Sequence, residues 1–315
     1  MSEKIDTLSN TNFNFPNQSS VYHGKVRDVY LVGNLFVSIV TDRISAFDYI
    51  LPKAIPYKGQ VLNQIAAYFL EATREIVPNW YEKSPDPNVS IGSIADPIRI
   101  EVVVRGYLTG HAWRTYNLGK RTLCGVPLAE GMKKNQAFEQ PIITPTIKAI
   151  EGHDSDISEE ELLNHQHISP ENWEIIKRYA FDLFGLGQKM ANERGLILVD
   201  TKYEFGFSKG EIILIDEIHT PDSSRYFYKE DYENSIKTGD EPKQLSKEFV
   251  REWLLLNGFS GLEGQNIPEM DDQIVTAISD KYIELYELVT GKTFIRENTT
   301  NFENRIYNNL LPYLS

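Results

Sequence analysis

The chain has 315 residues, a formal net charge of −13 and a single cysteine, Cys124. This length is enough to bury a large core and favours a division into two lobes. The negative charge argues against a general nucleic-acid or membrane binder, so any anionic ligand requires a local basic cluster. A single cysteine excludes an intrachain disulfide and a thiolate metal site.

Nothing in the sequence suggests export or membrane insertion. No stretch approaches the ~20 consecutive apolar residues that a membrane-spanning helix requires. Residues 1–6 also lack the apolar segment of a secretion signal. We therefore expect a cytoplasmic protein without a membrane or nucleic-acid partner.

The first third of the chain alternates short apolar runs with turn residues. The runs between residues 21 and 40, broken by Gly24 and Gly33, predict an antiparallel meander. Apolar residues at helical spacing predict a helix over residues 60–77. Residues 79–96 show the pattern of a loop.

The remainder of the chain mixes strands, loops and helices. Residues 98–105 predict a strand, whereas residues 106–168 contain many Gly, Pro, Thr and His and suit long functional loops. Capping residues and apolar periodicity predict helices at 170–194, 244–256, 271–290 and from about residue 300. This order of elements favours an α+β fold with a nucleotide site between two lobes.

Three charged residues, Asp200, Lys202 and Glu204, stand at alternate positions of a predicted strand. Alternate residues of a strand share a face, so two carboxylates and an amine would project together. A solvated hairpin face with mixed charges is the alternative. It fits poorly, because the apolar run at 211–215 reads as a strand buried on both faces.

The turn between these two strands decides which residues face each other. A turn that pairs Phe207 with Glu211 would put Asp216 opposite Lys202, so that three acids would crowd one lysine. Carboxylates packed this closely repel one another unless a cation lies among them. The donors are oxygen atoms, with no nearby Cys or His, so the expected cation is Mg²⁺.

A second informative segment is the turn Gly24-Lys25-Val26-Arg27. Glycine lets the backbone approach a phosphate closely, and the two basic residues supply counter-charge. The spacing is that of neither a P-loop nor a dinucleotide-binding fingerprint. It is similar to the lid loop that covers ATP in kinase-like and ATP-grasp enzymes, with an ordinary hairpin turn as the alternative.

Five motifs that occur in order are more specific together than any one alone. They lie at residues 41–48, 101–111, 144–148 (leading into Gly152-His153-Asp154), 200–204 and 216–225. Together they strongly resemble the family of phosphoribosylaminoimidazole-succinocarboxamide synthases, the SAICAR synthetases of purine biosynthesis. The resemblance extends from about residue 22 to residue 290.

The resemblance implies an ATP-dependent ligase that joins L-aspartate to the carboxylate of carboxyaminoimidazole ribotide through an acyl phosphate. It also implies a two-lobed, ATP-grasp-like fold with antiparallel sheets and C-terminal helices. We expect a β-rich lobe with the ATP lid loop at residues 1–100. An α+β lobe with the charged hairpin and terminal helices would follow at residues 101–315.

The same resemblance assigns individual residues. ATP would be bound by Gly24, Lys25, Val26, Arg27, Glu101, Lys148, Glu204 and Asp216, and Mg²⁺ by Glu204 and Asp216. The ribotide would be bound by Arg105, His111, Asp200, Lys202, Ser224, Arg225, Lys247 and Arg251. The residues placed at the reacting groups are Asp200, Lys202 and Asp216. For the pair Lys247 and Arg251, a solvated helix face is the alternative.

One position departs from the family pattern. His111 stands where the family usually has serine, and it could either contact a phosphate or pack beside Trp113. Two other functions remain as alternatives. One is a small-molecule kinase, although the sequence has neither the His-Arg-Asp nor the Asp-Phe-Gly motif of kinases. The other is a nucleotide-binding module without catalysis. The sequence leaves the oligomeric state open.

Overall fold

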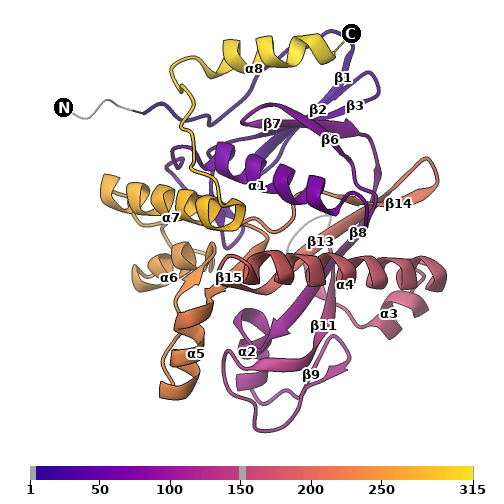
Figure 1. Ribbon diagram of the computed structural model, residues 1–315, viewed down its shortest axis with the longest axis vertical. Coiled ribbons are helices and arrows are strands. Elements are labelled where there is room, and N and C mark those ends of the chain that lie inside the picture. Colours follow the sequence, from indigo (N-terminus) through magenta and orange to yellow (C-terminus); the bar gives the residue numbers. More distant parts are fainter. Residues whose placement is uncertain (1–4, 149–153, 315) are drawn as a thin grey trace.

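The computed structural model describes residues 5–148 and 154–314, and Figure 1 shows its arrangement of sheets and helices. Gly152 and His153, which the sequence motifs include, lie outside the described residues. Within the described stretches, none of the helices combines the length and the apolar character needed to cross a membrane. Two antiparallel sheets with helices packed around them give the α+β class that the sequence predicts.

The first sheet is an antiparallel meander extended by a hairpin, in the order β1-β2-β3-β7-β6. Its strands are β1 (Gln18–His23), β2 (Arg27–Val32), β3 (Leu35–Val40), β6 (Tyr81–Asp86) and β7 (Val89–Ser93). The predicted meander is confirmed, but the loop expected at 79–96 is wrong, because β6 and β7 form there. Pro85 obscures β6 in the sequence, and an edge strand tolerates proline because it needs fewer ladder donors.

The second sheet has the order β12-β11-β8-β13-β15-β16, with β14 paired to the end of β13. Its strands are β8 (Asp96–Tyr107), β11 (Ala137–Ile147), β12 (Ser155–Asp156), β13 (Leu196–Ser208), β14 (Glu211–Ile215), β15 (Ser224–Tyr228) and β16 (Gln244–Leu245). Two small hairpins, β4 (Ser45–Ala46) with β5 (Tyr49–Ile50) and β9 (Thr122–Leu123) with β10 (Val126–Pro127), complete the described strands.

The central strand β13 has three partners. It pairs with β8 along most of one edge, while its other edge pairs first with β15 and then with β14. Charged residues from three distant parts of the chain are therefore brought to one strand. In particular, Asp200 lies opposite Arg105 of β8 and Arg225 of β15.

The register predicted for the β13–β14 hairpin is wrong by one residue. Ser208, rather than Phe207, pairs with Glu211. The turn contains only Lys209 and Gly210, both with positive φ (52° and 84°), as two-residue hairpin turns prefer. Strand β14 then ends at Ile215, before the position that was expected to face Lys202.

Helices cover the sheets. They are α1 (Lys58–Thr73), α2 (Gly110–Asn117), α3 (Glu159–Asn164), α4 (Pro170–Asn192), α5 (Lys229–Thr238), α6 (Glu248–Leu256), α7 (Asp272–Thr290), α8 (Phe302–Leu310) and the short 3₁₀ helix η1 (Leu311–Tyr313). The long helix α4 packs on β13 and β8, and α1 packs beside α7. The Ser169 hydroxyl caps α4 by accepting a hydrogen bond from the Asn172 amide, as the sequence predicts.

Two helical predictions need correction. Residues 106–168 are not mainly loops, since they contain α2, β11 and α3. The helix predicted at 244–256 begins only at Glu248, because residues 244–245 form β16. Helix α5 was not predicted, because few apolar residues mark its inward face.

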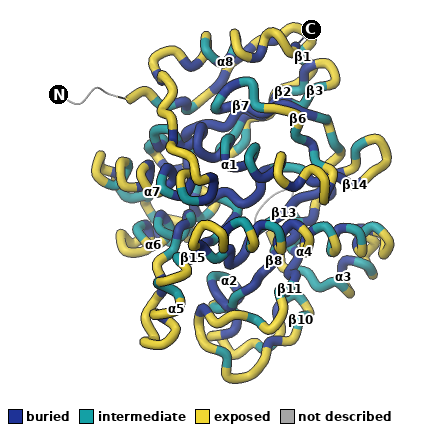
Figure 2. Tube along the Cα trace, in the orientation of Figure 1, coloured by how far each residue is buried: buried dark blue, intermediate teal, exposed yellow. Residues whose placement is uncertain are grey.

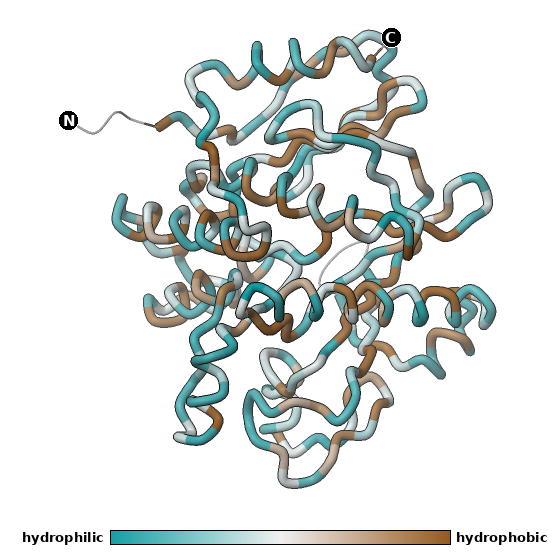
Figure 3. Tube along the Cα trace, in the orientation of Figure 1, coloured by the Kyte–Doolittle hydropathy of each residue, from teal (hydrophilic) through white to brown (hydrophobic). Residues whose placement is uncertain are grey.

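The described residues form three hydrophobic clusters, and the two largest lie where Figure 2 shows buried residues and Figure 3 shows hydrophobic stretches. The larger one joins the second sheet to α1, α4 and α7. The smaller one joins the first sheet to residues near both ends of the chain, including Phe15, Ile306 and Leu310. The C-terminal helix α8 therefore packs with the N-terminal sheet, and the lobe boundary near residue 100 stays a prediction.

Candidate active site

Two adjoining pockets lie between the sheets and their flanking loops. The first, of about 480 Å³, contains Gly24 to Arg27 with Lys148, Glu204 and Asp216, and we call it the lid pocket. The second, of about 560 Å³, contains Arg105, Arg114, Arg225 and Arg251, and we call it the arginine pocket. Three residues line both pockets: Lys202, Asp222 and Lys247. A ligand in one pocket can therefore meet a ligand in the other.

Lys202 lies in a cluster of carboxylates. Its Nζ is 2.9 Å from Glu101 Oε1, 2.5 Å from Glu204 Oε1 and 3.7 Å from Asp216 Oδ2. The expectation that three acids surround this lysine is met, but Glu101 takes the place expected for Asp200. Lys148 adds a second ammonium group, 2.8 Å from Glu204 Oε2.

The charges of this cluster follow from its contacts. Burial disfavours the Glu204 carboxylate, but the Lys202 and Lys148 ammonium groups outweigh this effect and lower its pKa to about 2. Burial likewise disfavours the Lys202 ammonium, but the Glu204 and Glu101 carboxylates raise its pKa above the ordinary value. Lys202 is thus cationic at neutral pH, so it is suited to neutralise negative charge rather than to accept a proton.

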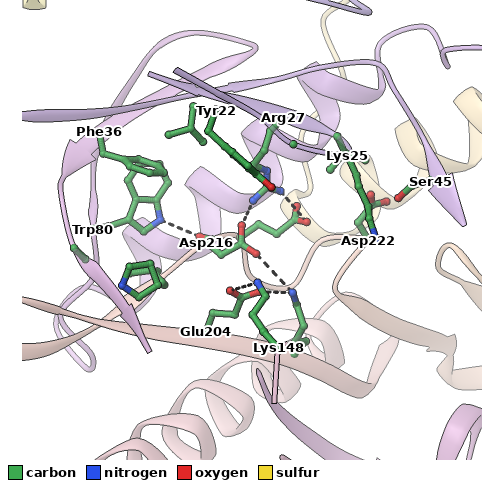
Figure 4. Close-up of a pocket in the computed structure, with 18 of the residues that line it drawn as sticks. Tyr22, Lys25, Arg27, Phe36, Ser45, Trp80, Lys148, Glu204, Asp216 and Asp222 are labelled. Carbon is green, nitrogen blue, oxygen red and sulfur yellow. Dashed lines mark hydrogen bonds and ion pairs between the residues drawn. The ribbon is translucent and has the colours of Figure 1, made fainter. Parts of the chain in front are cut away.

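Asp216 joins the two sheets. Its carboxylate pairs with the Arg27 guanidinium, which also lies 2.9 Å from Glu217 Oε1, and its carbonyl oxygen accepts a 2.9 Å hydrogen bond from Trp80 Nε1 (Figure 4). The backbone of Asp216 has φ of 63°, which turns the chain out of β14. This turn brings the carboxylate toward Lys202 despite the shifted hairpin register. No sequence motif predicted that Trp80 lines the lid pocket.

Arg43 stabilises the lid turn through hydrogen bonds to its backbone. The Arg43 guanidinium donates to the carbonyl oxygens of Gly24 (2.8 Å) and Lys25 (3.2 Å). A Cβ atom on Gly24 would lie 2.9 Å from the Arg27 carbonyl oxygen, so this tight turn requires glycine. The half-exposed Lys25 side chain reaches across to Asp48 Oδ1, 2.5 Å away at the tip of the β4–β5 hairpin.

Asp200 organises the arginine pocket. Its Oδ2 lies 2.8 Å from Arg225 Nη1 and 3.6 Å from Arg105 Nη1, as the sheet register requires. Arg225 also pairs with Glu248 at 3.1 Å. A Cβ atom on Gly110 would lie 2.4 Å from Arg225 Nη1, so the glycine at the start of α2 makes room for this guanidinium.

Almost all predicted site residues lie in one of the two pockets. Every residue predicted to bind the ribotide lines the arginine pocket: Arg105, His111, Asp200, Lys202, Ser224, Arg225, Lys247 and Arg251. The residues predicted to bind ATP line the lid pocket, except Glu101, which pairs with Lys202 but does not line the pocket. Those that line it are Gly24, Lys25, Val26, Arg27, Lys148, Glu204 and Asp216. Their individual roles stay predictions.

His111 has an acidic partner. Its Nε2 lies 2.7 Å from Asp156 Oδ2, and both side chains are partly exposed. Lys247 stands at the N-cap position of α6, and its Nζ lies 3.2 Å from Asp222 Oδ2, while Arg251 pairs with Glu248 at 3.0 Å. The alternative of a solvated helix face is wrong for Lys247, because this residue is buried.

Sequence reasoning missed Asp222, which lies where the two pockets meet. Its carboxylate pairs with Lys58 and Lys247, each at 3.2 Å, and accepts a 2.5 Å hydrogen bond from the Tyr282 hydroxyl. Burial disfavours this carboxylate, but the Lys247 and Lys58 ammonium groups lower its pKa. Its place in the motif at 216–225 was the available signal. The partners come from distant segments that no local pattern connects.

The oxygen donors around Lys202 bear on the predicted magnesium ion. Within the described ranges, no group of three or more His, Cys, Asp and Glu is arranged to hold a metal. Glu204 and Asp216 supply only oxygen donors, and Mg²⁺ commonly takes one or two carboxylates together with substrate phosphates and water. The donor set therefore fits Mg²⁺ bound together with a nucleotide.

Comparison with known proteins gives one consistent result. The family model described as SAICAR synthetase matches residues 20–262. A phosphoribosylaminoimidazole-succinocarboxamide synthase of Bacteroides thetaiotaomicron is 56% identical over 313 residues, which cover 99% of this chain and 100% of that protein.

Solved structures agree with the sequence comparison. SAICAR synthase of Saccharomyces cerevisiae, solved with SAICAR, superposes with a TM-score of 0.77 at 31% identity and covers 91% of this chain and 99% of that chain. A SAICAR synthetase solved with ADP has a TM-score of 0.68 at 22% identity and covers 88% and 100%, a likeness of fold.

Proposed function

This chain belongs to the SAICAR synthetase family, and on that premise we propose that its two pockets bind ATP and carboxyaminoimidazole ribotide side by side. The chain carries the SAICAR synthase activity of its family, a ligase reaction of purine biosynthesis. In the proposed reaction, L-aspartate is joined to the ribotide carboxylate while ATP is converted to ADP and phosphate.

One observation carries the assignment of pockets. Lys202 lines both pockets. On the same strand, Asp200 two residues before it lines the arginine pocket, and Glu204 two residues after it lines the lid pocket. A γ-phosphoryl group in the lid pocket and a carboxylate in the arginine pocket would meet at this ammonium group. The relative that was solved with ADP supports a nucleotide ligand for this fold.

The proposed chemistry begins with activation of the carboxylate. A carboxylate is a poor acceptor for an amine, so its oxygen attacks the γ-phosphorus and ADP leaves. The amine of aspartate then attacks the carbonyl carbon of the acyl phosphate, a C–N bond forms and phosphate leaves. Transfer of a phosphoryl group depends mainly on positioning and on neutralisation of charge.

Different residues of the chain would bind the ATP phosphates and neutralise charge during phosphoryl transfer. Gly24, Lys25 and Arg27 would bind the ATP phosphates through the lid turn and its two cations. Lys202 would neutralise charge between the carboxylate and the γ-phosphate, because its pKa keeps it protonated. The lysine remains tied to the sheet by Glu101, so it is held in place before the substrates arrive.

Glu204 and Asp216 would hold Mg²⁺. The ion would supply additional neutralisation of the phosphate charge when it is bound. Both carboxylates already have cationic partners, Lys148 and Arg27 respectively. These partners would shift their contacts toward the ATP phosphates.

The ribotide would lie along the arginine pocket. Arg105 and Arg225 present planar guanidinium groups that can bind carboxylate or phosphate through two parallel hydrogen bonds. Asp200 fixes both of them, so the pocket is largely organised without a ligand. The cytoplasmic location stays a prediction.

Turnover assays test this function. The chain is incubated with ATP, Mg²⁺ and the ribotide, with and without L-aspartate, and ADP and SAICAR are measured. We expect ADP and SAICAR in equal amounts, and sustained turnover only with aspartate. Stoichiometric ADP formation on the ribotide without aspartate, accompanied by a stable phosphorylated product, would favour the kinase alternative.

A further inference from the structure

The basic side chains of the arginine pocket differ in whether they already have an anionic partner. The pocket is lined by seven of them: Arg105, His111, Arg114, Lys202, Arg225, Lys247 and Arg251. Six have a carboxylate within ion-pair distance. An incoming anion must share or displace these intramolecular partners.

Arg114 is the exception. Within residues 5–148 and 154–314, its guanidinium has no hydrogen bond or ion pair, and its side chain is exposed. Its electrostatic neighbours are Glu248, which attracts it, and Arg225 and Arg251, which repel it. A cation that is unpaired and has two further cations nearby creates a local positive potential that favours an added anion.

The position of Arg114 in the pocket fits one end of the substrate. Arg114, Arg225 and Glu248 line both the arginine pocket and a small adjoining cavity of about 130 Å³. Lys202 and Asp222 instead line the junction with the lid pocket. If the reacting carboxylate lies at that junction, the phosphate end of the same ribotide lies toward the opposite side, where Arg114 projects.

From these observations we propose that Arg114 binds the phosphate group of the ribotide and sets the preference for the phosphorylated substrate over its nucleoside. This inference rests on the proposed function. A phosphate monoester carries between one and two negative charges at neutral pH, and a guanidinium can bind it through two hydrogen bonds. Because Arg114 has no partner to lose, this contact is made without breaking an existing ion pair.

His111 lies on the same helical face, three residues before Arg114, and also lines the pocket. Its ring is already engaged by Asp156 at 2.7 Å. Of these two residues of α2, Arg114 is therefore the one whose side chain is available to bind an added anion. The arrangement assigns to this helix a phosphate contact that the sequence motifs do not include.

Binding of two matched ligands tests the proposal. The dissociation constants of the ribotide and of its dephosphorylated nucleoside are measured by calorimetry for the wild-type chain and for Arg114→Met. We expect the variant to bind the ribotide about 10- to 100-fold more weakly, since a charge-assisted hydrogen bond is lost. Its affinity for the nucleoside should change less than about twofold, which is within the effect of a distant surface substitution.

Two further variants make the result specific. Arg121→Met removes a partly buried arginine that pairs with Glu130 and lies outside the pocket, and it should bind both ligands as the wild type does. Arg114→Lys keeps the charge without the planar fork and should recover part of the lost ribotide affinity.

The outcomes are distinguishable. Equal weakening of ribotide and nucleoside by Arg114→Met would mean that Arg114 only supports the pocket, and unchanged ribotide affinity would also overturn the proposal. The turnover assay tests the proposed function independently of the role of Arg114. A wild-type chain that binds the ribotide but forms no SAICAR would contradict the proposed function, while the comparison of the two ligands would still decide the role of Arg114.

Discussion

Glu204 lies 2.5 Å from Lys202 and 2.8 Å from Lys148, and it is the carboxylate on which both lysines converge. Its pKa of about 2 means that it is ionised across the physiological range. A neutral side chain of the same shape at this position would leave two cations without their main partner. It would also remove one of the two proposed ligands of Mg²⁺.

The first prediction follows from this charge. Glu204→Gln should lower kcat by about 100-fold or more, because charge at the transferring phosphoryl group is no longer balanced, whereas the fold should survive. Steady-state assays at saturating Mg²⁺ and thermal unfolding measure the two effects. Glu211→Gln, at the exposed start of β14, is the matched control. Near-normal kcat in Glu204→Gln would contradict the proposed role of this residue as a Mg²⁺ ligand.

The buried residue His219 contributes to the stability of the fold rather than to turnover. Its Nε2 shares a 2.7 Å hydrogen bond with the Tyr203 hydroxyl, and its ring packs nearly perpendicular to the Phe69 ring, with centroids 4.7 Å apart. Burial lowers its pKa to about 3. Tyr203 lies between Lys202 and Glu204 in β13 and points to the opposite face of the sheet, so His219 ties the loop after β14 to the back of the catalytic strand.

The second prediction is a pH dependence. The folded-state pKa of His219 is below its unfolded value of about 6.5, so the unfolded chain binds the extra proton on acidification. The stability that His219 contributes is therefore present above about pH 6.5 and is lost as the pH falls toward 3. Between pH 6.5 and 5 the loss should be about 2 kcal/mol in the free energy of unfolding.

Denaturant unfolding at several pH values measures this loss. His219→Gln should flatten the pH dependence in that interval, whereas His165→Gln, at an exposed position, should leave it unchanged. The same acid sensitivity in His219→Gln and in the wild type would show that other groups cause it.

At the scale of elements, local patterns were predictable from the sequence and turn geometry was not. Alternation along β13 correctly placed Lys202 and Glu204 on one face, because a strand has a fixed period of two. The hairpin register depended on whether the turn had two or three residues. Both Lys209 and Gly210 adopt positive φ, and only the folded hairpin reveals this choice.

Tertiary packing limited the other element predictions. Two prolines, Pro141 and Pro145, hide β11, and the register shift before Ile142 shows how the sheet accommodates the first of them. The site has the same limitation: although Asp222 lies in the motif at 216–225, its contacts depend on Lys58 and Tyr282, which lie far away in the sequence. The motif at 101–111 ends before Arg114, so the sequence did not predict the role that we propose for it.

Helix α8 provides the third prediction. Ile306 is fully buried in the smaller hydrophobic cluster, and Arg305 in the same helix pairs with Asp86 of β6 at 2.9 Å. Ile306→Ala should lower the free energy of unfolding by about 2–5 kcal/mol, because it removes buried atoms and leaves a cavity. Leu311→Ala, at an exposed position just beyond α8, should have little effect.

Unfolding of both variants by denaturant measures the difference. The KM values for the substrates should remain unchanged in folded Ile306→Ala, because α8 lines neither the lid pocket nor the arginine pocket. Equal stability of the two variants would mean that α8 contributes little to the N-terminal sheet.

At the scale of the whole molecule, the active site depends on contacts between the two sheets. Arg27 of the first sheet pairs with Asp216 at the end of a strand of the second, and Trp80 hydrogen-bonds to the same residue. Lys25 pairs with Asp48, which lines the arginine pocket. These contacts connect the proposed nucleotide site to the proposed ribotide site, so that the two substrates can be brought together at Lys202.

The last prediction tests whether the two pockets act in one reaction. An acyl-phosphate route transfers one oxygen of the ribotide carboxylate to inorganic phosphate, because the carbon–oxygen bond breaks when the amine of aspartate attacks. Ribotide labelled with ¹⁸O in its carboxylate should therefore give labelled phosphate, and only when aspartate completes the turnover. Lys202→Met should suppress label transfer and SAICAR formation together, since charge between the carboxylate and the γ-phosphate is no longer neutralised. Mass spectrometry of the released phosphate measures the label, and the Glu211→Gln chain serves as the active control. SAICAR formed with unlabelled phosphate would exclude the acyl-phosphate route, because the carboxylate oxygen would then never have been bonded to phosphorus.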